Sequence, residues 1–221
     1  MRYVFHIIYL CFAFSATAQN YFSVEAWRDH LPYSKVLEVA KVQNTYYAST
    51  PYSIISVDNE NNEINKLSKV EGLSETGVSR IESNQSQQTL VVAYQSSNID
   101  LITNDGIINF SAILNSNIVG DKTIYELVEY ERYMYVCTGF GIVVIDLAKR
   151  EVKDTYIIGD NNTQVKIKDV HISQDSIFAL TDNGIKAANK NVPFLSDPNA
   201  WGNIDIPVGV SFDQLVSYEN D

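Results

Sequence analysis

Histidine and cysteine are the side chains best suited to metal binding and nucleophilic chemistry, and this chain has few of either. It contains three histidines and two cysteines among 221 residues. His30 and His171 are isolated, without the paired spacing of a zinc site. Cys137 lies in an alternating apolar stretch, which predicts a buried, inert thiol. We therefore expect neither a zinc site nor thiol catalysis.

Carboxylates are plentiful, and two of them facing each other would have the chemistry of a glycosidase pair. Asp58, Asp100 and Asp146 fall at or near the ends of expected strands. Polar side chains meet solvent there, so we expect structural or solvating roles. Residues 58–63 and 160–162 have the composition of loose calcium loops. They lack the alternation, central glycine and terminal glutamate of an EF-hand, which favours solvated turns.

Other catalytic signatures are missing from the sequence. It has no G-x-S-x-G elbow, no P-loop and no G-x-G-x-x-G motif. Gly139 and Gly141 are read as turn glycines needed for backbone geometry. Some of the 14 tyrosines could stack on sugar rings, but the sequence does not select which. We therefore expect no enzyme, no catalytic, cofactor-binding or metal-binding residues and no cofactor; the ligand-binding residues stay unknown.

The elements that would carry any site come from an internal repeat. Residues 133–146 form an apolar strand, a short turn and a second apolar strand ending in aspartate. The same shape recurs at 46–58, 90–102 and 177–189. The last residues of the first strands recur at steps of 44, 44 and 43: Thr50, Tyr94, Thr138 and Thr181. A fixed period in this range indicates a repeat architecture.

A second landmark gives the same period. One apolar position in the strand before each hairpin recurs at steps of 42, 46, 43 and 45: Val39, Ile81, Leu127, Val170 and Leu215. Four short strands per repeat, joined by Gly, Asn and Asp turns, are typical of a β-propeller blade. A β-sandwich need not repeat in sequence, and a β-helix has a shorter period. The predicted fold is all-β, an incomplete β-propeller.

The repeat predicts about four four-stranded blades and the start of a fifth. The first strand is expected at 36–40 and the fifth-blade strand at 212–218. Nearly continuous apolar runs, as at 90–93, suit strands covered on both faces. The fourth repeat is irregular in its second half, where alanines replace large apolar residues. The partial propeller is placed at 34–221, with blades at about 34–75, 76–120, 121–163, 164–210 and 211–221.

Residues 1–18 have the three parts of a secretory signal peptide. A positive start precedes an apolar core, and Ala16-Thr17-Ala18 is a cleavage site before Gln19. The core is too short to span a bilayer. Cys11 lies inside it between bulky residues, so we do not expect lipidation. Residues 19–33 form a lead-in, whose Trp27 and Tyr33 are expected to plug one end of the core.

The negative net charge of the chain limits the classes of partner that it can bind. The formal net charge is −11, and removal of the signal segment with Arg2 makes the mature charge about −12. Such a chain should avoid nucleic acid and anionic bilayers. No later apolar run has the length of a membrane helix, so we expect no transmembrane segment after cleavage. One cysteine remains, which excludes an internal disulfide. The expected location is the periplasm or the outer cell surface.

Four blades and one strand do not easily close a ring, because propellers have 4–8 blades that cover one another. At this period a seven-bladed ring needs about 300 residues. We therefore expect the sequence to be the N-terminal part of a longer protein.

Several motifs, in order along the mature chain, resemble the PorZ family of the type IX secretion system. They are the stretches 27–33, 71–75, 94–101, 140–147, 151–159 and 181–185. The resemblance implies two β-propellers and a C-terminal export domain. It implies a non-enzymatic surface component that binds sortase or other secretion components, and lipopolysaccharide or another glycan.

Two other interpretations stay open. The Gly-Leu-Ser-acid link at 72–75 also resembles the propeller repeats of Bacteroidetes hybrid two-component sensors, which implies a periplasmic oligosaccharide sensor. A polysaccharide-cleaving propeller is the weakest alternative. Separately, Asp175-Ser176-Ile177 resembles the short motif at which Bacteroidetes attach O-glycans to exported proteins.

Overall fold

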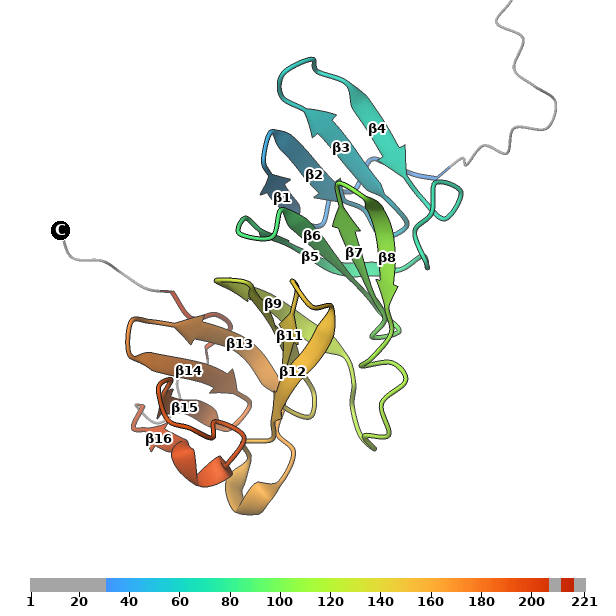
Figure 1. Cartoon of the computed structure of the whole chain (residues 1–221). Coiled ribbons are helices and arrows are strands. Elements are labelled where there is room, and N and C mark those ends of the chain that lie inside the picture. The colour runs from blue at the N-terminus through green and yellow to red at the C-terminus, as the bar shows by residue number, and fades with distance from the viewer. Residues whose placement is uncertain (1–30, 207–211, 217–221) are drawn as a thin grey trace, which may run out of the picture.

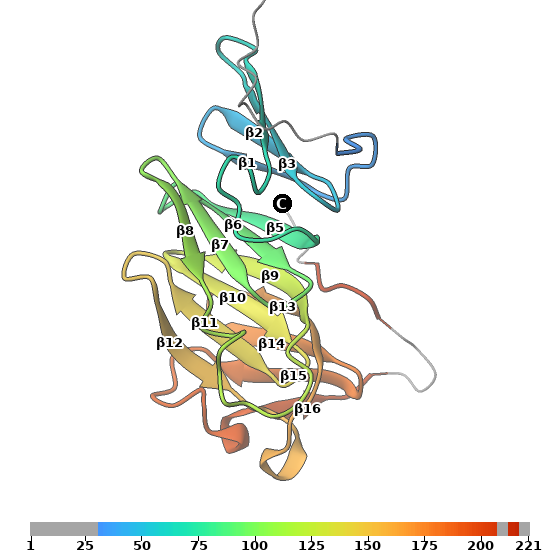
Figure 2. The ribbon, with the colours of Figure 1, turned by 90° about the vertical axis from the view of Figure 1, so that its right-hand side faces the viewer.

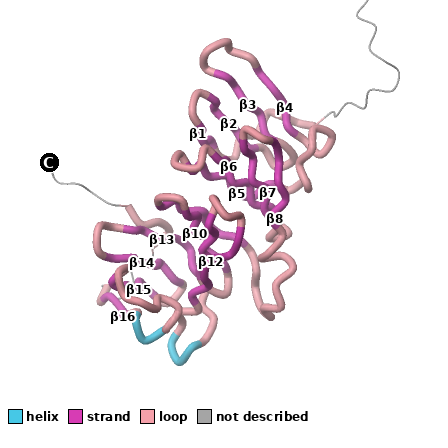
Figure 3. The backbone as a smooth tube through the Cα atoms, viewed as in Figure 1, coloured by secondary structure: helices cyan, strands magenta, loops and turns pink. Residues whose placement is uncertain are grey.

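The computed structural model describes residues 31–206 and 212–216. The expected signal peptide, Trp27 and His30 lie outside the described residues. Within them, strands dominate and the helical elements are two short 3-10 turns (Figure 3). The strands form four separate antiparallel sheets of four strands each, in chain order within every sheet. We call these sheets blades 1 to 4.

The blades have the following strands. Blade 1 contains β1 (Val39–Val42), β2 (Thr45–Ser49), β3 (Ile54–Asp58) and β4 (Ile64–Leu67). Blade 2 contains β5 (Val78–Asn84), β6 (Thr89–Tyr94), β7 (Ile99–Thr103) and β8 (Gly106–Phe110). Blade 3 contains β9 (Ile124–Tyr130), β10 (Tyr133–Thr138), β11 (Ile142–Asp146) and β12 (Glu151–Tyr156). Blade 4 contains β13 (Ile167–Ile172), β14 (Ser176–Thr181), β15 (Gly184–Asn189) and β16 (Gly202–Ile204). The 3-10 turns are η1 (Asp160–Asn162) and η2 (Pro198–Ala200).

The blades follow one another along an arc from blade 1 to blade 4 (Figure 1). The view turned by 90° shows successive sheets stacked face against face (Figure 2). The first strands β1, β5, β9 and β13 contact one another in succession, so they line the inner side of the arc. This arrangement confirms the predicted all-β propeller architecture.

The apolar core lies between neighbouring blades, in three separate clusters. Strand β6 contributes residues to two of these clusters. Leu90 and Val92 pack toward blade 1, and Val91 and Ala93 pack toward blade 3. A strand covered on both faces has no solvent side for polar residues, which explains its nearly continuous apolar sequence. The expectation that neighbouring blades cover such strands is confirmed.

A β-bulge interrupts the first strand of blades 2, 3 and 4 at the same place. One residue of each first strand lacks a partner on the second strand: Ser79, Tyr125 and Lys168. A bulge re-aims the side chains that follow it. The next residues are charged, and with Glu38 of blade 1 they form what we call the inner row: Glu38, Arg80, Glu126 and Asp169.

The inner row ties the blades together. The Arg80 Nε lies 3.3 Å from the Glu38 carboxylate and 3.7 Å from the Glu126 carboxylate. It also donates to the Tyr125 carbonyl at 2.8 Å. One guanidinium therefore contacts blades on both sides, and Glu38 further accepts a hydrogen bond from the Ile81 N–H at 2.7 Å.

Two expected strands differ from the structure. Strand β1 begins at Val39, because the Leu37 N–H and the Glu38 carbonyl both bond Ser49, which makes this segment irregular. Residues 212–216 form no strand. The Leu215 N–H instead donates to the Asp169 carboxylate at 2.7 Å, so a side chain takes the place of a ladder partner.

Tyr33 is partly buried, and the Lys66 ammonium of β4 lies 4.1 Å from the centre of its ring, in a cation–π contact.

Candidate functional site

The carboxylate of Asp100 is fully buried in blade 2, so the expectation that it meets solvent is wrong. It accepts hydrogen bonds from the Ser74 N–H at 2.7 Å and the Ser74 hydroxyl at 2.6 Å. The Tyr94 hydroxyl donates at 2.6 Å and the Asn109 amide at 3.1 Å. Burial, reinforced by the bond to Asp100, raises the pKa of Tyr94. Asp100 thus clamps the link that enters blade 2 and has a structural role.

Asp146 is also buried, which again contradicts the expected solvent exposure. Its carboxylate pairs with Arg132 at 2.8 Å and accepts from the Lys149 N–H at 3.2 Å. Asp58 is partly exposed, and it accepts from the Glu60 N–H at 2.7 Å in a polar turn. The expected solvated turn at 58–63 is confirmed.

These three aspartates lie in three different blades and each is occupied by its own local donors. They are therefore not arranged as a glycosidase pair. Among the described residues, no group of three His, Cys, Asp or Glu side chains is placed to hold a metal ion.

Cys137 is fully buried in the cluster between blades 3 and 4. Burial raises the pKa of its thiol well above the ordinary value, which disfavours the nucleophilic thiolate. The expected buried thiol is confirmed. His171 lies partly exposed on β13, where its ring stacks on Phe178 at 6.4 Å between centroids.

The turn between the second and third strands is locked by a threonine hydroxyl in blades 1, 3 and 4. In each, the hydroxyl donates to the carbonyl three residues later, at 3.1, 2.7 and 2.8 Å. The pairs are Thr50 with Ser53, Thr138 with Gly141, and Thr181 with Gly184. This hydrogen bond explains why threonine marked the repeat in the sequence.

Gly141 meets the expectation of a role in backbone geometry. It has φ of +151°, and a Cβ there would lie 2.2 Å from the Tyr156 carbonyl oxygen, so the position requires glycine. At Gly139 the reason is space, because a Cβ there would lie 2.3 Å from the carboxylate of the Asp121 side chain.

Blade 4 departs from the repeat at Lys186. The strand register places it in the position held by Val143 in blade 3 and by Asp100 in blade 2, both buried. Lys186 is itself only 7% exposed. Its Nζ lies 2.7 Å from the carboxylate of Asp160 in η1. A buried ammonium is costly without a partner of opposite charge, and Asp160 of η1 supplies that partner.

The connection between β15 and β16 is the second departure. It spans residues 190–201 and contains η2. Asp197 caps η2 by accepting from the Asn199 N–H at 2.9 Å. The Trp201 indole donates to the Leu195 carbonyl at 2.8 Å, and its ring packs 6.2 Å from Tyr156. The corresponding connections of blades 1 to 3 are short turns, at 59–63, 104–105 and 147–150.

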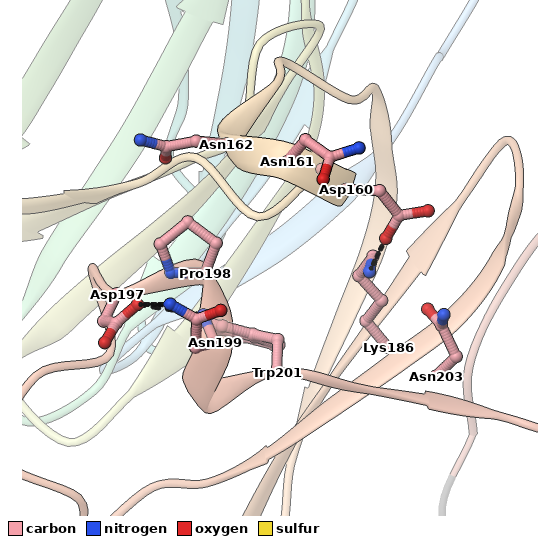
Figure 4. A pocket seen from close by; sticks show the side chains of 10 residues that line it. Asp160, Asn161, Asn162, Lys186, Asp197, Pro198, Asn199, Trp201 and Asn203 are labelled. Carbon is pink, nitrogen blue, oxygen red and sulfur yellow. Dashed lines mark hydrogen bonds and ion pairs between the residues drawn. The ribbon is translucent and has the colours of Figure 1, made fainter.

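A polar groove opens between η1 and η2. It has a volume of about 550 Å³. We call it the blade 4 groove, and its polar lining is Asp160, Asn161, Asn162, Lys186, Asp197, Asn199 and Asn203. Figure 4 shows the η1 residues on one side, Asp197, Pro198 and Asn199 on another, and Lys186 near Asn203. A second hollow of about 260 Å³ shares Asp160, Lys186 and Asn203 with it.

The electrostatics of the groove are those of a weakly acidic, amide-rich surface. Lys186 is offset by Asp160, and Asp197 adds a further negative charge. The side-chain amides of Asn161 and Asn203 make no hydrogen bond to another described residue. Amides both donate and accept, so the groove offers paired hydrogen bonds to a polar ligand.

Sequence reasoning missed this groove. It read residues 160–162 as a solvated turn, and η1 is indeed exposed, but Asp160 there partners the buried Lys186. The irregular second half of the fourth repeat was the available signal. Ser176 of the expected glycosylation motif opens β14, partly buried, and its N–H donates to the Ser173 hydroxyl at 3.2 Å. Glycan attachment there stays a prediction.

Comparisons with known proteins place the chain in a family. The family model described as the N-terminal β-propeller domain of PorZ, of the type IX secretion system, matches residues 46–202. A solved structure of PorZ from Porphyromonas gingivalis, described as an essential bacterial surface component of that system, is 26% identical with a TM-score of 0.68. The match covers 77% of this chain and 22% of that one.

More distant structures share the fold alone. The extracellular domain of a hybrid two-component system from B. thetaiotaomicron is 13% identical, with a TM-score of 0.60. The match covers 83% of this chain and 24% of that domain. AztD from Citrobacter koseri is 15% identical, with a TM-score of 0.53, over 69% of this chain and 44% of its own. No curated protein matches in a sequence search.

The matched region runs from the second residue of β2 to the first residue of β16, so β1 lies before it. Among the described residues, no helix has the length and apolar character needed to cross a bilayer. The chain spans about a fifth of the length of the PorZ structure that it matches. On the family match, and with the four blades that the structure shows, the chain belongs to the PorZ N-terminal β-propeller family of the type IX secretion system.

Proposed function

We propose that this chain is the propeller region of an exported, non-enzymatic component of the type IX secretion and surface-attachment machinery, located in the periplasm or at the cell surface. In this role the propeller binds other secretion or sortase components and lipopolysaccharide. The observation that carries the proposal is the family match over residues 46–202, joined by the 26% identity with PorZ.

The local chemistry supports a binding role over a catalytic one. The buried carboxylates of Asp100 and Asp146 are saturated by structural donors, and the Cys137 thiol is shielded from solvent. Propeller surfaces present loops on a rigid scaffold, which suits recognition of partners.

The alternative is a periplasmic oligosaccharide-sensing propeller of a hybrid two-component regulator. Its support is likeness of fold at 13% identity, which carries no functional information by itself. The sequence beyond residue 221 separates the two proposals. A second propeller and an export domain favour the secretion role, whereas a membrane helix and a histidine kinase favour the sensor.

Deletion of the gene in its own bacterium tests the proposal. We expect cargo proteins of the type IX system to be lost from the cell surface, and a plasmid copy of the full-length gene to restore them. Surface labelling followed by mass spectrometry measures the cargo, and crosslinking of the full-length protein identifies its partners. Unchanged surface cargo in the deletion strain would refute the secretion role, and turnover of a glycan by the purified protein would refute the non-enzymatic one.

A further inference from the structure

The blade 4 groove exists because two features of blade 4 depart from the repeat. Lys186 stands where blade 3 has the buried Val143, and the connection at 190–201 replaces a short turn. Neither is needed to build a blade, since blade 3 is built with Val143 and blades 1 to 3 have short turns. A buried ion pair is also weak evidence for stability, because an apolar residue of similar size often serves as well. Local departures from an otherwise consistent pattern are expected at functional sites.

The backbone of η1, which carries part of the polar lining of the groove, is held in a fixed conformation. Asn161 and Asn162 adopt left-handed backbone angles, with φ of 54° and 62°. A Cβ on Gly159 would lie 2.3 Å from the Thr163 carbonyl oxygen, so the chain makes a tight turn as it enters η1. Lys186 anchors η1 from below through Asp160. The backbone that carries Asn161 and Asn162 is therefore preorganised, which lowers the entropic cost of binding.

The charges of the groove exclude two ligand classes. An anion would meet the carboxylates of Asp160 and Asp197, while the Lys186 ammonium is already paired. A divalent cation would have to compete with the Lys186 Nζ, which lies 2.7 Å from the Asp160 oxygen that it would need. Calcium also takes six to eight oxygen ligands, typically including several carboxylates. An uncharged polar ligand fits this balance best.

We infer that the blade 4 groove binds a neutral, hydroxyl-rich ligand, a short stretch of uncharged saccharide. Each sugar hydroxyl both donates and accepts, as do the free amides of Asn161 and Asn203. The volume of about 550 Å³ lies within the usual range for ligand sites, and the adjoining hollow gives room for a chain of sugars. The inference rests on the glycan-binding part of the proposed function and locates it.

The test is calorimetric titration of the full-length protein with neutral oligosaccharides of two to four sugar units, and separately with lipopolysaccharide. The key variant combines Asn161→Gly, which keeps the left-handed turn, with Asn203→Ala. Both residues are exposed, so the fold should survive. The matched control is Asn104→Ala, an exposed asparagine of the blade 2 turn.

We expect at least one neutral oligosaccharide to bind, the double variant to lose about tenfold or more in affinity, and the control to be unchanged. Tighter binding of sulfated or carboxylated analogues at the groove, or calcium binding that the double variant abolishes, would overturn the inference. Lipopolysaccharide binding that the double variant leaves intact, with no neutral ligand bound, would overturn it and leave the proposed function standing. Absence of all glycan binding would overturn both.

Discussion

Blades 3 and 4 are consecutive copies of the same repeat, yet they use their third strands differently. In β11 every residue is buried, whereas β15 alternates between buried, partly buried and exposed residues. Where β11 has Val143 and Val144, β15 has Lys186 and Ala187. Blade 3 thus shows what the fold requires of a blade. The differences in blade 4 show what the fold can accommodate when a neighbouring segment supplies a partner.

Blade 2 sharpens the comparison, because it also places a charge inside. In the strand register Asp100 takes the position of Val143 and Lys186, but its four hydrogen bonds come from protein groups that enclose it. Lys186 has a partner that is itself 72% exposed in its side chain. The hydrogen bonds of Asp100 hold protein segments together and leave none of its polar atoms to solvent. The partner of Lys186 is at the surface, so its carboxylate stays accessible to solvent and ligands.

The largest predicted effect comes from substitutions at the equivalent positions 143 of β11 and 186 of β15. Val143→Lys places an ammonium in the core of blade 3 without a carboxylate partner, and should destabilise the fold by more than about 3 kcal/mol. Lys186→Met should change stability by less than about 1 kcal/mol, because Asp160 remains solvated. Urea unfolding followed by circular dichroism measures both. Equal losses would mean that blade 4 is no more tolerant than blade 3.

Asp100→Ala should cost about 3 kcal/mol, because it leaves the buried Tyr94 hydroxyl and the Ser74 N–H without their acceptor. Asp58→Ala removes an acceptor from a partly exposed turn and should cost less than about 1 kcal/mol. Thermal unfolding of the two variants compares them. A small effect at Asp100 would show that solvent reaches this site.

The turn glycines of blades 3 and 4 form a matched pair. Gly141→Ala combines a φ of +151° with a Cβ 2.2 Å from the Tyr156 carbonyl oxygen, and should cost about 2 kcal/mol or more. Gly184→Ala has a φ of +130°, but its nearest neighbour, Ile206, is 3.7 Å away. Its cost should be near 1 kcal/mol, from backbone strain alone. Calorimetric unfolding should preserve this order, and a reversal would contradict the packing argument.

Cys137→Ser should fold, lose about 1 kcal/mol and leave ligand binding intact. The equivalent position in blade 1 is Ser49, whose buried hydroxyl accepts from the Glu38 N–H at 3.1 Å. In blade 3 Glu126 lies opposite Cys137 in the strand register, as Glu38 lies beside Ser49 in blade 1, so we expect its N–H to serve a serine in the same way. The melting temperature checks the predicted loss of stability, and oligosaccharide titration checks the predicted unchanged binding. Lost binding in a folded variant would mean that the thiol takes part in ligand binding.

The smallest effect concerns the inner side of the arc. Burial raises the pKa of Glu82, and Glu129 and Glu38 raise it further. Because the folded state holds this proton more tightly than the unfolded state, stability falls as pH rises through the interval above the ordinary carboxyl pKa. Glu82→Gln should therefore raise the melting temperature at pH 7 and leave it nearly unchanged at pH 4. Substitution of the exposed Glu60 by glutamine is the control. An equal change of melting temperature in the two variants would mean that burial of Glu82 does not cause the effect.

Much of the fold could be predicted from the sequence. Strands β2, β3, β10 and β11 lie where the repeat placed them, apart from single residues at their ends. The physical reason is that each blade buries the same positions against the same kinds of neighbour, so apolar residues and turn residues recur at a fixed period. The burial of Cys137 and the need for glycine at 141 followed from that pattern as well.

The tertiary structure alone decided which charges are buried and what they meet. Asp100 and Asp146 stand near strand ends in the sequence, but their burial depends on donors such as Ser74 and Arg132 that other segments bring. Asp160 and Lys186 are 26 residues apart, and they meet because the link between blades 3 and 4 folds over β15. Periodicity records which positions face a neighbouring blade. The groove arises from contacts between segments that follow no period, so it became visible only in three dimensions.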